Sequence, residues 1–293
     1  MSRKLEFAWL DVFTRTPLEG NQLAVYPNAQ GLTGSEMQSI AREMHLSETT
    51  FVFPKDEPVD GEPSYPTRIF TVSEEMPFAG HPTLGTAAYL SESTGSQRIV
   101  LDLKVGRIPV QFSRRDGVRF GEMKQIDPVV GQTHDRQAVA NALNVDPDEI
   151  DPRRPIQTLS TGSPFAIVPF RSRNALSRVH PDWIVMNDYL SGTDAKLFYL
   201  IAPGASDLVG SVAARMFFWA GEDPATGSAA GPAVAWMVLH AVAKPGQLVL
   251  LEQGLEIRRR SQIFARADFR EGRPCDVRVG GHVVLLGRGE MAF

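Results

Sequence analysis

Two short segments of the sequence combine glycine with the expected start of a helix. They read Ala79-Gly80-His81-Pro82 and Ala225-Thr226-Gly227-Ser228. Glycine lets a ligand approach the backbone closely, and the first N–H groups of a helix have no partner within it. Each junction is therefore predicted to be able to bind a carboxylate or another oxyanion. The alternative is two ordinary helix starts that bind nothing.

Glu48 lies in the segment His45-Leu-Ser-Glu-Thr-Thr-Phe-Val-Phe53, at the start of an expected apolar strand. Leu46, Phe51 and Phe53 flank it, so its carboxyl group is predicted to be partly desolvated. Desolvation raises the pKa of a carboxyl group, which can then act as a base and afterwards as an acid near neutrality. The alternative is a carboxylate in a surface turn or at a helix end.

Asp223 and His81 stand at the two glycine-containing junctions. Asp223 directly precedes Pro224 before a helix start, where it could meet a ligand or simply complement the helix dipole. His81 would ordinarily be a structural histidine, but at an anion-binding junction it is a plausible acid, base or orienting group.

Other chemistries leave patterns that this sequence lacks. It contains no Gly-x-Gly-x-x-Gly fingerprint, no phosphate loop and no Gly-x-Ser-x-Gly elbow. The six histidines show no metal-ligand spacing, and Cys275 is the only cysteine, so neither a zinc site nor a pair of thiols is expected. Catalysis is predicted to rest on carboxylates and imidazole.

An internal repeat indicates which elements position these residues. Residues 68–81 and 215–228 align without a gap at an offset of 147, with Arg, Phe, Glu, Pro and Gly recurring in register at 68/215, 70/217, 75/222, 77/224 and 80/227. A weaker match joins residues 20–27 to 162–169. A duplicated fold is therefore predicted.

Each copy is expected to contain short strands around an Ala-rich helix, from His81 to about Ser91 and from Gly227 to about Ala241. Thr33 and Glu36 have capping-box spacing and predict a helix to about Leu46; another is expected at 135–143. Strands are predicted at 5–13, 22–27, 66–72, 98–104, 107–113 and 117–123, and at 156–160, 165–169, 195–201, 213–219, 247–252, 255–260, 264–269 and 275–286. The domains are expected to be 1–126, completed by a strand at about 280–293, and 127–279.

Composition limits the class of protein. The 293 residues are 43% hydrophobic with a net charge of −4, which fits two domains of about 130–150 residues and gives no basic field for nucleic acid. The run Arg258-Arg259-Arg260 is interpreted as a solvated strand or turn face. With no signal-peptide pattern, no apolar run near about 18 residues and a single cysteine, a cytoplasmic protein without a membrane partner is expected.

These residues resemble the PhzF phenazine-biosynthesis family, relatives of diaminopimelate epimerase. The specific matches are Pro77 to Gly85 and Glu222 to Ser228; the supporting ones are Asp11-Val-Phe-Thr14, Gly20-Asn21, Leu46 to Phe51, Gln253-Gly254 and Gly272-Arg-Pro274. The resemblance implies an α+β, diaminopimelate epimerase-like fold. In this fold two pseudo-symmetric half-barrel domains each wrap around a central helix, and the active site lies in the cleft between them.

The resemblance also implies roles for individual residues. Glu48, His81 and Asp223 match the family's catalytic acid–base positions, and Gly80, Gly227 and Ser228 match positions that line the substrate site. The implied activity is isomerisation of trans-2,3-dihydro-3-hydroxyanthranilate without a cofactor or metal, because the conjugated substrate delocalises its own electrons. Glu48 would move the proton from the ring carbon bearing the hydroxyl to a conjugated carbon, while His81 and Asp223 hold the amine and hydroxyl groups.

The expected partner is a small-molecule carboxylate, and the family suggests a homodimer. Two departures could change the shape of the pocket: Gln22-Leu23 replaces the usual Pro-Ala after Gly-Asn, and Cys275 stands where Ser is usual. Two other functions stay open, an epimerase or racemase of a small acid on the same fold and a catalytically silent ligand-binding or interaction protein.

Overall fold

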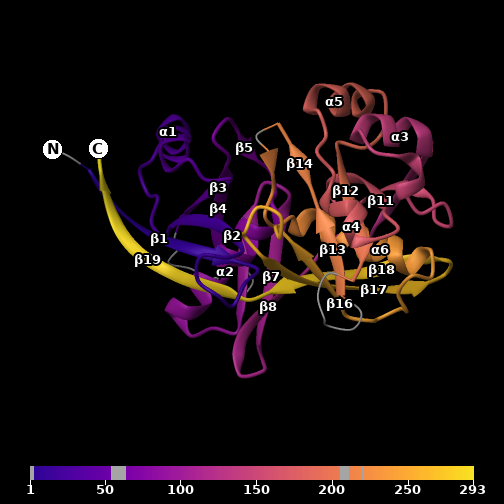
Figure 1. Ribbon diagram of the computed structural model, residues 1–293. Helices are drawn as coiled ribbons and strands as arrows, with labels where there is room; N and C mark the ends of the chain where they lie inside the picture. The colour runs from indigo at the N-terminus through magenta and orange to yellow at the C-terminus, as the bar shows by residue number, and fades with distance from the viewer. Residues whose placement is uncertain (1–2, 54–63, 205–210, 220) are drawn as a thin grey trace. The chain divides into compact units, whose positions relative to one another are not determined.

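The computed structural model describes residues 3–53, 64–204, 211–219 and 221–293 (Figure 1). The chain divides into two compact units. The N-terminal unit comprises Met1–Lys124 together with Gly280–Phe293, and the C-terminal unit comprises Gln125–Val279. Among the described residues, no helix has both the length and the apolar character needed to cross a lipid bilayer.

The N-terminal unit is a curved sheet in which the last strand of the chain lies beside the first. β19 pairs antiparallel with β1, as Figure 1 shows, and the ladder continues through β2, β3, β4, β6, β7 and β8; β2–β3 and β4–β6 are its parallel pairs. Short β5 pairs with β4. The strands are β1 (Lys4–Val12), β2 (Asn21–Tyr26), β3 (Glu48–Val52), β4 (Ser64–Phe70), β5 (Glu75–Met76), β6 (Arg98–Leu103), β7 (Gly106–Arg115), β8 (Val118–Lys124) and β19 (Val283–Ala292).

The helix α2 (Gly80–Thr94) occupies the centre of this unit and contacts strands all round it, namely β1, β2, β3, β6, β7, β8 and β19. Gly85 allows the close approach, because a Cβ atom there would lie 2.5 Å from Leu23 Cδ2 and 2.8 Å from Val12 Cγ2. The second helix, α1 (Gly34–Met44), contacts β3 and β4, and the predicted capping box of Thr33 and Glu36 is present.

The C-terminal unit repeats the same ladder. β9 pairs with β10, followed by β11, β12, β13, β16 and β17, and the parallel pairs β11–β12 and β13–β16 fall at the corresponding places. The strands are β9 (Val129–His134), β10 (Ile156–Ser160), β11 (Pro164–Pro169), β12 (Leu197–Pro203), β13 (Ser211–Arg215), β14 (Phe217–Phe218), β15 (Gly221–Glu222), β16 (Val249–Gln253), β17 (Ser261–Arg270) and β18 (Arg273–Gly281).

The helix α6 (Gly227–Leu239) is central in this unit and contacts β10, β11 and β17. Nearly all of its residues are buried, as its apolar composition predicted. The remaining helices are α3 (Arg136–Leu143), α4 (Arg173–Ser177), α5 (Trp183–Ser191) and the 3₁₀ turn η1 (Pro147–Glu149). The predicted α+β fold, with two similar half-barrels that each wrap a helix, is confirmed.

The recurring arginine and glutamate of the repeat form the same ion pair in each unit. Arg68 donates from Nε and Nη2 to Glu75, with both distances 2.7 Å, and Arg215 donates to Glu222 at 3.0 and 2.7 Å. The recurring phenylalanines, Phe70 and Phe217, lie under the two guanidinium groups at 5.1 and 4.6 Å from ring centre to Cζ. Each pair clamps the hairpin that leads to a central helix.

Three strand predictions are wrong. Residues 255–260 form a turn, because Gly254 and Arg258 have φ angles of +74° and +59° and Arg259 N donates back to Gly254 O at 2.9 Å. The expected strand 275–286 is two strands separated at His282, whose carbonyl group leaves the ladder to accept from Phe13 N. The strand expected at 213–219 is divided between β13 and β14.

Candidate active site

Glu48 is the first residue of β3, as the sequence predicted. The preceding helix α1 ends at Met44 and is capped by His45, whose left-handed conformation (φ 52°) turns the chain into the strand. β3 runs parallel to β2 with Glu48 opposite Leu23, and the next four residues are buried. The side chain of Glu48 is 17% exposed, so the expected partial desolvation of its carboxyl group is confirmed.

His81 is the second residue of α2 and is almost fully buried. Its Nε2 atom lies 3.4 Å from Glu48 Oε2 and 3.2 Å from the Gln22 carbonyl oxygen. Burial lowers the pKa of His81 to about 3, since a charged imidazolium would lose its hydration. The ring is therefore neutral near pH 7, and it lies beside Glu48 as a polar neighbour and not as a cation.

The first turn of α2 supplies donors beside this pair. The residue before the helix, Ala79, offers no side-chain oxygen to cap it. The N–H groups of Gly80 and His81 have no acceptor within the helix, and Pro82 has no N–H group. This end of α2 can therefore donate hydrogen bonds to an oxyanion.

Asp223 belongs to the C-terminal unit and follows the hairpin β14–β15. It is 9% exposed, its N–H group donates to Met216 O at 3.0 Å, and its Oδ2 atom accepts from Thr226 Oγ1 at 2.6 Å. The carboxyl group is thus held in a buried loop by a defined partner, which suits a group that must meet a ligand in one orientation.

The start of α6 resembles that of α2. Thr226 is in the capping position, but its hydroxyl group bonds to Asp223 and Gln253 and makes no capping hydrogen bond to the helix. Gly227 and Ser228 therefore begin the helix with N–H groups that lack an intrahelical acceptor. Gly227 O accepts from Gln125 Nε2 at 3.0 Å, which fixes this first turn from the other side.

No role for Gln253, at the end of β16, follows from the sequence, although Gln253-Gly254 is one of the supporting matches to the PhzF family. Its amide is fully buried and makes four hydrogen bonds. Nε2 donates to Asp223 O at 2.7 Å and to Thr226 Oγ1 at 2.8 Å, and Oε1 accepts from Thr226 N and Tyr199 Oη, both at 3.1 Å. Gln253 therefore holds the segment from Asp223 to the helix start.

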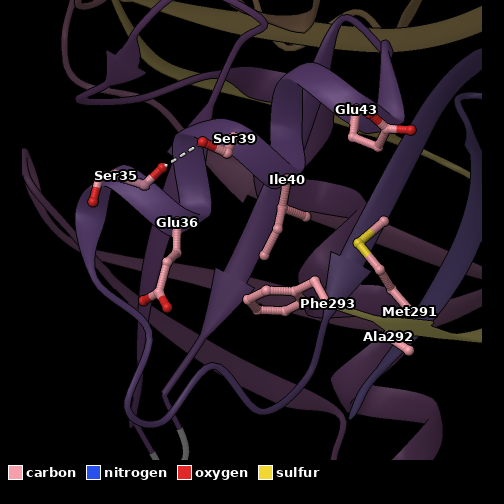
Figure 2. Close-up of a pocket in the computed structure, with 8 residues that line it drawn as sticks. All are labelled: Ser35, Glu36, Ser39, Ile40, Glu43, Met291, Ala292 and Phe293. Carbon is pink, nitrogen blue, oxygen red and sulfur yellow. Dashed lines mark hydrogen bonds between the residues drawn. The ribbon is translucent and has the colours of Figure 1, made fainter. Parts of the chain in front are cut away.

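A separate groove of about 540 Å³ lies on the N-terminal unit, between one face of α1 and the end of β19 (Figure 2). Glu36 in this groove already accepts from Thr33 and Arg3, and Ile40, Met291 and Phe293 supply apolar surface. No residue predicted to do chemistry lines it. Across the described ranges, no three His, Cys, Asp or Glu side chains are grouped as metal ligands.

Comparison with known families gives one match along nearly the whole chain. Residues 10–289 match the model of the phenazine biosynthesis-like proteins, PhzC-PhzF. The chain is 36% identical to the trans-2,3-dihydro-3-hydroxyanthranilate isomerase of Pseudomonas fluorescens over 97% of this chain and 98% of the relative. It is 34% identical to the isomerase of the same name from Pseudomonas aeruginosa over 96% of each chain.

Solved structures agree in fold. A predicted epimerase from Pseudomonas aeruginosa is 33% identical, with a TM-score of 0.84 over 98% of this chain and 99% of that one. A PhzF-family phenazine biosynthesis protein from Bacillus anthracis is 25% identical, with a TM-score of 0.87 over 99% of each chain. A probable proline racemase from Agrobacterium radiobacter, 13% identical with a TM-score of 0.65 over 99% of this chain and 93% of that one, shares the fold alone.

Proposed function

Because the chain belongs to the PhzF family of isomerases, we propose that it moves a proton within a small, carboxylated, unsaturated ring. The substrate class is that of trans-2,3-dihydro-3-hydroxyanthranilate, the compound in the names of two relatives. The observation that carries the proposal is the mostly buried carboxyl group of Glu48, 3.4 Å from a neutral, buried His81.

In the proposed reaction, Glu48 removes a proton from the ring carbon that bears the hydroxyl group. The electron pair left behind is delocalised through the conjugated ring, and the same carboxylic acid returns a proton to a conjugated carbon. One C–H bond breaks, another forms and the double bond moves, so the substrate is neither oxidised nor reduced. A single group can do both steps because the carboxylate accepts the proton as a base, and the carboxylic acid so formed then donates it as an acid.

The other residues serve to hold and polarise the substrate. His81 stays neutral beside Glu48, since burial lowers its pKa to about 3. Asp223 holds the amine or hydroxyl substituent, and the helix starts at Gly80, Gly227 and Ser228 donate N–H groups to negative charge. Donors fixed where charge develops commonly contribute about 3 kcal/mol each to transition-state stabilisation.

The test is to incubate the protein with candidate ring acids in deuterium oxide and follow the label by NMR. Deuterium at a new carbon together with a shifted double bond supports isomerisation. Deuterium at a single inverted centre assigns an epimerase instead, and a ligand that binds without any exchange assigns a binding protein.

Glu48→Gln removes the proton carrier and keeps the shape of the side chain. We expect the exchange rate to fall on the order of 10²–10⁴-fold, the usual contribution of a general acid–base group. Glu43→Gln is the matched control, because it makes the same chemical change on the exposed side of α1 and should leave the rate unchanged. A Glu48→Gln protein with wild-type exchange would refute the role of Glu48.

A further inference from the structure

Asn21 is a buried polar residue to which the proposed mechanism gives no task. It is the first residue of β2, is 1% exposed and pairs with Val12 of β1. The preceding Gly20 has a φ angle of +72°, and a Cβ atom there would lie 2.4 Å from Val12 O. The turn thus requires glycine, and it fixes the position of Asn21 at the buried start of β2. Burying an amide is costly unless its hydrogen bonds are made, so the contacts of Asn21 define its role.

The amide nitrogen Nδ2 of Asn21 lies 3.2 Å from His81 Nδ1. An amide NH₂ group can only donate, so Nδ1 must be the acceptor, and the ring proton must be on Nε2. The opposite side of the ring gives the same answer independently. Nε2 lies 3.2 Å from Gln22 O, which can only accept, and 3.4 Å from Glu48 Oε2. Both ring nitrogens therefore specify one tautomer.

We infer that Asn21 is a positioning residue that fixes His81 as the Nε2–H tautomer, so that Nε2–H donates to Gln22 O and the N–H end of the ring, not a lone pair, lies 3.4 Å from Glu48 Oε2. In the other tautomer, Nδ1–H would face the Asn21 NH₂ group, and the Nε2 lone pair would face the Gln22 carbonyl and the Glu48 carboxylate. Because the positive end of the Nε2–H dipole lies near Oε2 of Glu48, negative charge on that oxygen is stabilised, and the proton that Glu48 takes up is favoured on Oε1. The catalytic consequence rests on the proposed function, whereas the tautomer itself does not.

The first test needs neither a variant nor a substrate. The ¹⁵N chemical shifts of ¹⁵N-histidine-labelled protein distinguish protonated from unprotonated ring nitrogens, and a His81→Gln spectrum identifies the His81 signals among the six histidines. We expect Nε2 protonated and Nδ1 unprotonated at pH 7. A wild-type ring protonated on Nδ1 would overturn the inference whatever the protein catalyses.

Asn21→Asp is the sharpest variant, because it replaces the donor with an acceptor of the same shape. The carboxylate would accept from Nδ1–H, so the His81 signals should show a proton on Nδ1. The lone pair of Nε2 would then face the Glu48 carboxylate in place of the N–H dipole, and we expect kcat to fall about tenfold with a smaller change in KM. Asn28→Asp is the matched control, since Asn28 is exposed in the same unit. Its amide oxygen accepts a hydrogen bond from Gln30 N, and a carboxylate oxygen of aspartate can accept the same bond.

The outcomes separate this inference from the proposed function. If no ring acid exchanges, the proposed function fails while the tautomer measurement still decides the role of Asn21. If the Asn21→Asp ring moves its proton to Nδ1 and exchange stays at the wild-type rate, the orientation of His81 does not matter for catalysis and the inference is refuted. A retained Nε2–H signal in Asn21→Asp would refute it as well, and a wild-type Tm keeps either result from being an unfolding effect.

Discussion

Replacing Arg215 by methionine should destabilise the C-terminal unit far more than the same change at Arg68 destabilises the N-terminal unit. The two arginines are equivalent in the repeat, and each makes two hydrogen bonds to its glutamate. Their surroundings differ. Arg215 and Glu222 have side chains 2% and 5% exposed, whereas Arg68 is 35% exposed and Glu75 14%.

The expected loss can be worked from these contacts. Breaking a buried ion pair by removing one partner typically costs about 3–5 kcal/mol, because the other charge is left buried. Arg215 Nη1 also donates to the carbonyl oxygens of Leu176, Ser177 and Val179, at 2.9 to 3.1 Å, around the end of α4. These losses do not simply add, so about 4 kcal/mol is expected for Arg215→Met.

At the matched position the cost is small. Lys104 Nζ lies 2.9 Å from Glu75 and remains as a counter-charge after Arg68→Met, and exposed or partly exposed pairs contribute about 1 kcal/mol or less. Hydrogen exchange followed peptide by peptide reports the two units separately and avoids assuming a single unfolding transition. Equal losses in the two units, or a loss below about 1 kcal/mol for Arg215→Met, would show that burial does not set the strength of these pairs.

Two further predictions concern the candidate site. Gln253→Leu keeps the volume of the side chain but removes the amide that bonds to Asp223, Thr226 and Tyr199. The free energy of unfolding of the C-terminal unit should therefore fall by about 2–4 kcal/mol, and exchange activity should fall with it. A free energy of urea unfolding within 0.5 kcal/mol of the wild-type value would contradict this. The second concerns acid: since the pKa of His81 is about 3 in the folded protein and near 6.5 when unfolded, the unfolded state binds the extra proton between these values. The contribution of the neutral His81 ring to stability is therefore fully present above pH 6.5 and is lost as the pH falls, by up to about 1.4 kcal/mol per pH unit. Measured at pH 7.5, 6 and 5, the free energy of unfolding should fall less steeply with decreasing pH for His81→Gln than for wild type.

The fold was predictable where a pattern is local or repeated. The helix α6 starts at Gly227 as expected, α2 starts at Gly80, one residue before the expected His81, and Thr33 caps α1 as its spacing indicated. The prediction failed where a backbone turn overrides composition. Residues 255–260 have the residue types of an exposed strand, but Gly254 and Arg258 adopt positive φ angles and the chain turns back.

The candidate site was predictable only in part. Partial burial of Glu48 follows from its apolar neighbours in sequence, but its closeness to His81 depends on the parallel pairing of β2 with β3 and on how near α2 lies to them. The bonding of Asn21 and Gln253 has no local signal at all, because each amide meets partners brought from distant parts of the chain.

The repeat also shows which interactions the two copies share and at which equivalent positions their side chains differ. At the offset of 147, Arg68 and Glu75 correspond to Arg215 and Glu222, and both pairs are made. His81, by contrast, corresponds to Ser228, and Asp223 corresponds to a methionine in the first copy. An ion pair that positions a helix start can serve any group placed there, so both copies can keep it, whereas the proposed function gives the two helix starts different tasks, which need different side chains. Substitutions of the residues that the two units share are accordingly expected to change stability, and substitutions of the residues that differ are expected to change catalysis.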